Sequence, residues 1–113
     1  MTDRVLEIGH FGAGYCGRLF AHAGYDVVRI EPTAAAPGWV SSAASDRYLH
    51  AGKRRIATAD PVLIEQLASR AQIIIAEAAT ADELVHLGFD RWQAPVKVAI
   101  TPFGRTGPKC NWQ

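Results

Sequence analysis

Short apolar runs alternate along the chain with segments whose hydrophobic residues recur at helical spacing. The apolar runs are expected to form strands at 5–8, 26–31, 73–76 and 96–100, with a weaker strand at 55–58. The run at 73–76 is apolar throughout, which is typical of a strand that is covered on both faces of a sheet. The runs therefore predict a buried sheet.

Three helices are expected between these strands. In the first, the apolar positions follow helical spacing and Gly24 is the expected end; they are Cys16, Leu19, Phe20 and Ala23. Asp60 and Pro61 open the second helix, because Asp caps a helix and Pro fits its first position. Its apolar face is formed by Leu63, Ile64, Leu67 and Ala68. A capping box from Thr80 to Glu83 starts the third helix, which Gly88 ends.

The regular alternation of strand and helix predicts a Rossmann-like α/β fold. This fold is an open parallel sheet with helices on both faces, in three αβα layers, and residues 1–113 make a single domain. The Ala-, Ser-, Pro- and Gly-rich residues 32–52 are expected to form a long loop, and 102–113 a tail. Ligands of such sheets bind beyond the carboxyl ends of the strands. The segments expected at that edge are 9–17, the loop after Glu31, 76–80 and 101–108.

Composition and charge exclude several classes of protein. Of 113 residues, 49% are hydrophobic and 20% are charged, which is typical of a globular domain. The net charge of +1 gives no electrostatic basis for nucleic-acid binding. No apolar run approaches the ~20 residues that span a bilayer, and the start lacks a secretion signal, so we expect no membrane contact and a cytoplasmic location. Cys16 and Cys110 have no metal-ligand spacing, so no metal site is expected.

A glycine motif follows the first strand. Gly12-Ala13-Gly14-Tyr15-Cys16-Gly17 spells GxGxxG, and Glu31 closes the next strand, as in the dinucleotide fingerprint. There, the helix N-terminus receives a pyrophosphate and the acid holds a ribose hydroxyl. Three residues from Gly9 to Phe11 separate strand and motif, which departs from that pattern. Three interpretations remain open: a dinucleotide site, a site for another phosphate ligand, or glycines that only permit a tight turn and close helix packing.

Four segments, taken in order, resemble the family III coenzyme A (CoA) transferases, the CaiB/BaiF family. The stretch VLEIGHFGAGYCGRLFAHAGYDVVRIEP is similar to the family's first strand, Ala-Gly turn, helix and second strand. His50–Ile56 resembles its Gly-Lys-Arg segment, and Leu87-Gly88-Phe89 resembles its Leu-Gly turn. ITPFGRTGP at 100–108 is similar to its Phe-Gly-x-Thr-Gly-Pro signature, the most specific of the four.

This resemblance implies a function in acyl-CoA metabolism. Intact members transfer CoA between carboxylic acids through a nucleophilic Asp, or racemise acyl-CoA esters with a His and an Asp. The N-terminal part binds CoA, and members form interlocked dimers. The nucleophilic Asp lies downstream of the signature, whereas this sequence ends at Gln113. We therefore assign no catalytic residue and expect no activity from these residues alone. The expected partners are CoA or acyl-CoA, together with a second copy or the remainder of a CoA-transferase chain.

The resemblance also implies positions that contact CoA. Phe11, Gly12 and Ala13 occupy the turn that lies near the thiol end of CoA, and Gly14 follows them. Pro32 stands where some members place an Arg on the nucleotide phosphate.

Two further segments carry implied contacts. Lys53 and Arg54 match a basic pair that neutralises phosphate charge. Ala78 and Ala79 stand where the family has an Asn and a Phe against adenosine, and His86 replaces a typical Arg. Because each lost contact costs about 1–3 kcal/mol, we expect weak affinity for CoA.

Two other functions stay open. The first is a non-catalytic assembly module from a degenerate copy, which Ala78 and Ala79 suit, with apolar sheet surface left for a partner. The second is an NAD-binding Rossmann module, which GxGxxG and Glu31 favour. That alternative leaves the segments at 52–54 and 100–108 unexplained.

Overall fold

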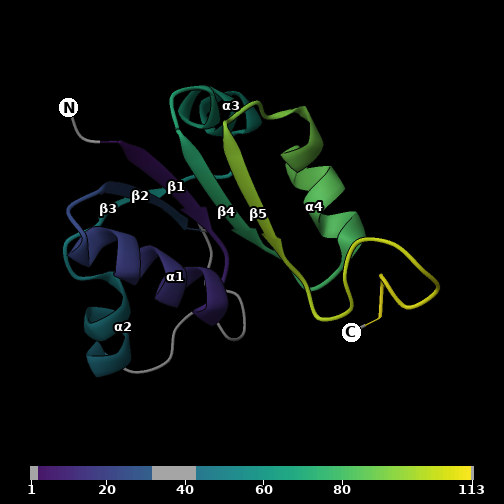
Figure 1. Ribbon diagram of the computed structural model, residues 1–113, viewed down its shortest axis with the longest axis horizontal. Helices are drawn as coiled ribbons and strands as arrows, with labels where there is room; N and C mark the ends of the chain where they lie inside the picture. The colour runs from purple at the N-terminus through teal and green to yellow at the C-terminus, as the bar shows by residue number, and fades with distance from the viewer. Residues whose placement is uncertain (1–2, 32–42, 113) are drawn as a thin grey trace.

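The computed structural model describes residues 3–31 and 43–112 (Figure 1). Within these residues one parallel sheet has the strand order β3-β2-β1-β4-β5. The strands are β1 (Arg4–Ile8), β2 (Asp26–Glu31), β3 (Arg54–Ala57), β4 (Ile73–Glu77) and β5 (Val96–Ile100). The helices are α1 (Phe11–His22), α2 (Ala43–His50), α3 (Pro61–Ser69), α4 (Ala81–Leu87) and the short 3₁₀ helix η1 (Phe89–Arg91).

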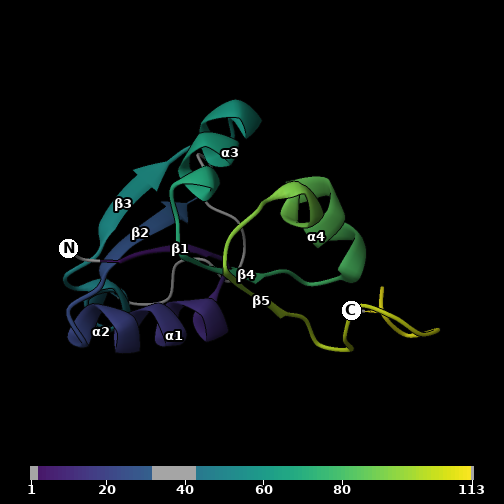
Figure 2. The ribbon, with the colours of Figure 1, turned by 45° about the horizontal axis from the view of Figure 1, so that its top comes forward.

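The helices cover both faces of the sheet. Figure 2 shows α1 and α2 on one face and α3 and α4 on the other. The predicted Rossmann-like, three-layer α/β fold is therefore confirmed. All five predicted strands are present, with bounds that differ from the predictions by at most one residue.

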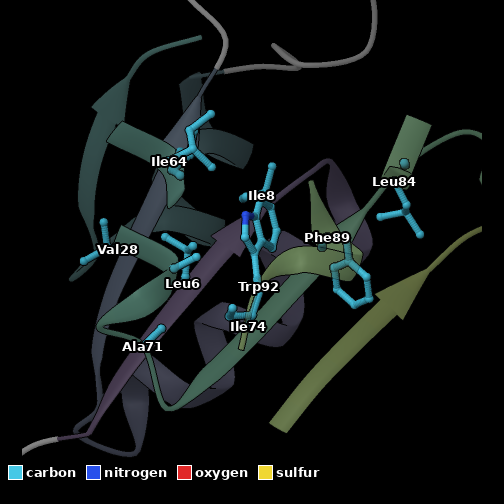
Figure 3. Packing of buried hydrophobic residues seen from close by; sticks show 13 residues of the cluster. Leu6, Ile8, Val28, Ile64, Ala71, Ile74, Leu84, Phe89 and Trp92 are labelled. Carbon is cyan, nitrogen blue, oxygen red and sulfur yellow. The ribbon is translucent and has the colours of Figure 1, made fainter. Parts of the chain in front are cut away.

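Each face of the sheet has its own hydrophobic core. The larger core joins the sheet to α3, α4 and η1 (Figure 3). Its members include Leu6, Val28, Ile64, Ile74, Leu84, Phe89 and Trp92. The smaller core under α1 includes Val5, Ala13, Val27 and Ile75. Because burying one large aliphatic side chain contributes about 1.5–3 kcal/mol, these two clusters hold the layers together.

The predicted helix ends are confirmed by their hydrogen bonds. Val62 N–H donates to Oδ1 of Asp60, and Glu83 N–H donates to the Thr80 hydroxyl. Gly88 ends α4 with a φ of 104°, a left-handed conformation that favours glycine. Local sequence therefore fixes where α3 and α4 begin and where α4 ends.

Part of the predicted loop at 32–52 is wrong, because residues 43–50 form α2. This helix buries only Leu49 and His50, so it lacks the apolar periodicity that would have revealed it. Contacts with residues outside the helix hold it in place instead: both terminal guanidinium nitrogens of Arg55 donate to the Asp46 carboxylate at 2.8 Å. Pro32 lies outside the described residues.

The predicted glycine loop at 9–17 is also wrong, because α1 already begins at Phe11. The buried residues of α1 are small: Ala13, Gly14 and Gly17. Leu19, which we placed on the apolar face, is 55% exposed. The glycines therefore allow a close approach of the helix to the sheet rather than forming a loop.

Residues after β5 lie beside the start of α4. Ala81 N–H donates to the Cys110 carbonyl, and Asp82 N–H donates to Oδ1 of Asn111. The Phe-Gly-x-Thr-Gly-Pro residues lie between β5 and these two contacts along the chain. Over the described parts of the chain, no helix is both long and apolar enough to cross a membrane.

Candidate functional site

A cleft of about 360 Å³ lies at the carboxyl ends of β1, β4 and β5. It is lined by His10, Glu77, Ala78, Ala79, Ile100, Thr101 and Pro102. Three of the segments that we expected at this edge therefore meet there: the turn after β1, the residues after β4 and those after β5. Ala78 and Ala79 are the predicted contact residues that line the cleft directly.

Glu77, the last residue of β4, connects the cleft to the start of α1. His10 precedes α1, but its side chain makes no capping hydrogen bond. Instead, the backbone N–H groups of His10 and Ala13 both donate to Oε1 of Glu77, each at 2.9 Å. A carboxylate from a neighbouring strand therefore caps this helix.

The other predicted contact residues are spread over the molecule. Phe11 is 68% exposed on the first turn of α1. Arg54 pairs with Asp26 at the amino end of β2, so it lies at the opposite edge of the sheet from the cleft. His86 on α4 contacts the Asp82 carbonyl through Nδ1 at 2.9 Å. The cleft therefore brings together only part of the predicted set.

Lys53 is buried rather than exposed to a ligand. Its side chain has 0% exposure, and its ammonium lies 2.6 Å from Oε1 of Glu7. It also donates to the Gly14 carbonyl at 2.8 Å and contacts Nδ1 of His50 at 3.0 Å. These internal contacts occupy the ammonium group, and a role toward phosphate stays a prediction.

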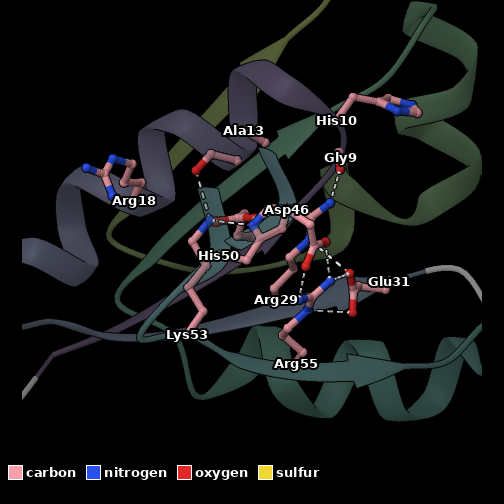
Figure 4. Close-up of polar contacts among 12 residues, drawn as sticks. Gly9, His10, Ala13, Arg18, Arg29, Glu31, Asp46, His50, Lys53 and Arg55 are labelled. Carbon is pink, nitrogen blue, oxygen red and sulfur yellow. Dashed lines mark hydrogen bonds and ion pairs between the residues drawn. The ribbon is translucent and has the colours of Figure 1, made fainter. Parts of the chain in front are cut away.

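Glu7, Arg29, Lys53 and His50, the last residue of α2, form a buried charge cluster. Figure 4 shows Arg29, His50 and Lys53 of this cluster. Arg29 pairs with Glu7, which faces it in the register of β1 and β2. Arg29 also donates to the Gly9 carbonyl at 2.8 Å, so the cluster supports the turn that leads into the cleft. Burial raises the pKa of Glu7, although Lys53 and Arg29 act in the opposite direction.

The GxGxxG glycines lie close against side chains from other parts of this chain. A Cβ atom at Gly17 would lie 1.7 Å from Oε1 of Glu7, and one at Gly14 would lie 3.1 Å from Cε1 of His50. A Cβ atom at Gly12 would lie 3.1 Å from Oε2 of Glu77. This spacing agrees with the third interpretation of the motif, in which the glycines permit close packing.

Arg55 fastens α2 to the end of β2. It donates to the carboxylates of Asp46 and Glu31, and these hydrogen bonds lower the pKa of both acids. Arg18 of α1 also donates to the Tyr48 carbonyl at 3.0 Å and lies over the Tyr48 ring. Glu31 is therefore engaged by arginine rather than directed at a ribose.

Acid is expected to destabilise the fold through His50. Desolvation, followed by the nearby charges of Arg29, Lys53 and Arg55, lowers the pKa of His50 from 6.5 to about 4, against a smaller opposing effect of Asp46. The unfolded chain therefore binds the proton more readily between these values, and stability falls as pH falls through them. From pH 7 to pH 5 the free energy of unfolding should decrease by about 2 kcal/mol.

Urea unfolding at both pH values checks this expectation, with His50→Gln as the matched variant. The variant should lose most of the decrease, since the lowered pKa values of Glu31 and Asp46 act at more acidic pH. An equal decrease in both proteins would show that His50 is not the responsible group.

Sequence reasoning overlooked Glu7, Arg29 and Glu77. The available signal was a charged residue inside each of two otherwise apolar strand segments, VLEI and VVRI. Such charges are rarely buried unless they are paired. Glu77 carried no comparable signal, because its importance depends on the distance to α1. In the described residues, no group of three or more His, Cys, Asp or Glu side chains is arranged to hold a metal ion.

Solved structures share this fold. The chain is similar to a CaiB/BaiF family protein from Brucella suis, with a TM-score of 0.77 and 22% identity, over 97% of this chain and 35% of that chain. It is also similar to Rv3272 from M. tuberculosis, with a TM-score of 0.73 and 20% identity, over 96% of this chain and 33% of that chain. The chain thus spans about a third of the length of these proteins. No family model and no curated protein matches the sequence.

Proposed function

We propose that this chain is the CoA-binding portion of a CaiB/BaiF-type protein and that it holds CoA or acyl-CoA weakly in the cleft at the carboxyl edge. The observation that carries this proposal is the cleft itself, formed by three strand ends on a fold shared with a CaiB/BaiF family protein. Ligands of open parallel sheets bind at this edge.

The lining of the cleft supports weak binding. Among the described residues, none that lines it is a Lys or Arg, so phosphate charge has no close cation there. Ala78 and Ala79 offer neither a side-chain hydrogen bond nor a ring for stacking on adenine. Most of the affinity must therefore come from backbone groups and apolar contact.

The carboxylates support a binding role rather than catalysis by this portion. Within the part of the chain that the structure describes, Glu77 is the carboxylate that lines the cleft, and two backbone N–H groups engage it. A nucleophilic carboxylate would need an oxygen directed at an acyl carbon. We propose that catalysis, if it occurs, uses residues supplied from outside this portion.

Two alternative functions remain from the sequence, an NAD-binding module and an assembly module. For an NAD-binding module, Glu77 already occupies the helix N-terminus that would receive a pyrophosphate, and Arg55 and Arg29 occupy Glu31. An assembly module stays a prediction, which Val96 and Val98 favour because they are exposed on the edge strand β5.

Titration calorimetry with CoA tests the proposed function, with two bulky substitutions as a matched pair. Ala79→Trp would fill the cleft, whereas Gln93→Trp would fill a hollow of about 350 Å³ beside α3 and η1. We expect a dissociation constant of about 0.1–1 mM for the unmodified chain. This corresponds to a binding free energy of only about 4–5.5 kcal/mol in magnitude. Ala79→Trp should abolish binding and Gln93→Trp should leave it unchanged.

Circular dichroism of both variants provides the folding control. Equal effects of the two substitutions would place CoA elsewhere, and no heat at millimolar CoA would contradict binding by this chain. Tight, stoichiometric binding would contradict the proposal that the site is weakened.

A further inference from the structure

The start of α1 has strong anion-binding character that the chain itself satisfies. The first N–H groups of a helix lack intrahelical partners, and the helix dipole favours a negative charge beside them. Here Oε1 of Glu77 receives the N–H groups of His10 and Ala13. The negative charge at this helix end is therefore an internal carboxylate.

The turn has the shape of this carboxylate side chain. Gly9 has a φ of 139°, and a Cβ atom there would lie 2.5 Å from the Cβ atom of Glu77. A Cβ atom at Gly12 would lie 3.1 Å from Oε2 of Glu77. Gly9 and Gly12 therefore leave room for the Glu77 side chain, and this side chain fills the space that a ligand phosphate would need.

Glu77 also lines the cleft, together with His10 and Thr101. No lysine or arginine lines the cleft within the described residues. Arg29 reaches the Gly9 carbonyl from the buried side of the turn, and its charge is engaged by Glu7 and Glu31. A phosphate or carboxylate that approached the turn would meet a like charge at short range. An uncharged group with an amide N–H would instead find an acceptor.

We propose that Glu77 is a specificity-determining residue, which keeps ligand anions away from the N-terminus of α1 and reserves the turn for an uncharged, amide-bearing part of the ligand. In naming the ligand as CoA, this inference rests on the proposed function. The exclusion of anions is a property of Glu77 whether or not CoA binds.

The test uses inorganic phosphate and formate, with the backbone amide signals of His10 and Ala13 followed by NMR. Glu77→Ala opens both N–H groups, and Glu77→Gln removes the charge but keeps an acceptor oxygen. Glu65→Ala on α3 is the control, because it changes the net charge equally and lies away from the turn. We expect both Glu77 variants to bind phosphate at least about tenfold more tightly than the unmodified chain.

Formate supplies an independent readout of the same site. It should raise the melting temperature of Glu77→Ala, because it replaces the missing carboxylate, and it should leave the unmodified chain and Glu65→Ala unaffected. If Glu77→Ala does not fold, the phosphate titration of Glu77→Gln decides the question. Equal phosphate binding by the unmodified chain and the Glu77 variants would overturn the inference. Neither arm contains CoA, so a failure here is distinct from a failure of CoA binding.

Discussion

Replacing Glu7 with glutamine is expected to lower the free energy of unfolding by about 3–5 kcal/mol. Glu7 is fully buried and is paired with both Arg29 and Lys53. Glutamine fills a similar volume but leaves two buried cations without their shared counter-charge. Removing one partner of a buried pair is costly for this reason, even where the intact pair adds little net stability.

Asp26→Asn is the matched control for this prediction. Asp26 is also paired with two cations, Arg4 and Arg54, but it lies at the amino end of β2 and the three side chains are 28%, 30% and 61% exposed, respectively. Exposed ion pairs contribute about 0–1 kcal/mol, so this variant should remain close to the unmodified chain. Urea unfolding at pH 7, followed by tryptophan fluorescence, measures both. A Glu7→Gln effect no larger than that of Asp26→Asn would contradict the assignment of the cluster as a structural centre.

Gly17→Ala is expected to destabilise the fold by about 3 kcal/mol or more. Helix propensity alone predicts the opposite, since Ala is favoured over Gly inside a helix by about 1 kcal/mol. In this structure the new Cβ atom would lie 1.7 Å from Oε1 of Glu7. Lys53 and Arg29 hold that carboxylate, so the helix must move away or the cluster must break.

Gly14→Ala, one turn earlier in α1, separates the clash from general effects of glycine. Its Cβ atom would meet Cε1 of His50 at 3.1 Å, a contact that a small shift of the ring can relieve. We expect a loss of about 1 kcal/mol or less for this variant. If Gly17→Ala were as stable as the unmodified chain, the close packing of α1 on Glu7 would be incorrect.

The sequence was sufficient for features with local causes. Apolar runs placed the strands, and Asp60, Thr80 and Gly88 placed the ends of α3 and α4. Helix α2 was missed because its stability comes from contacts such as Arg55 with Asp46, which no local pattern reveals.

The glycine motif shows how far the candidate site could be predicted from the sequence. Its spacing left open both a phosphate-ligand site and close helix packing, and the side chains that lie against its glycines are Glu7, His50 and Glu77. Strands β1 and β4 and helix α2 supply these side chains, and two of them, His50 and Glu77, lie far from the motif in sequence. The location of the candidate site at the carboxyl edge of the sheet was predictable from the alternation of strands and helices. The position of the Glu77 carboxylate at that edge could be found only from distances in the folded chain.

The most direct test of the proposed function is an NMR titration of the isotope-labelled chain with CoA. The amide signals of His10, Ala78 and Thr101 around the cleft should shift in a saturable manner. Those of Ser69 and Gln93, beside the second hollow, should stay in place. Saturable shifts confined to the second group, or no shifts at millimolar CoA, would contradict the proposal that the carboxyl edge of this sheet holds the ligand.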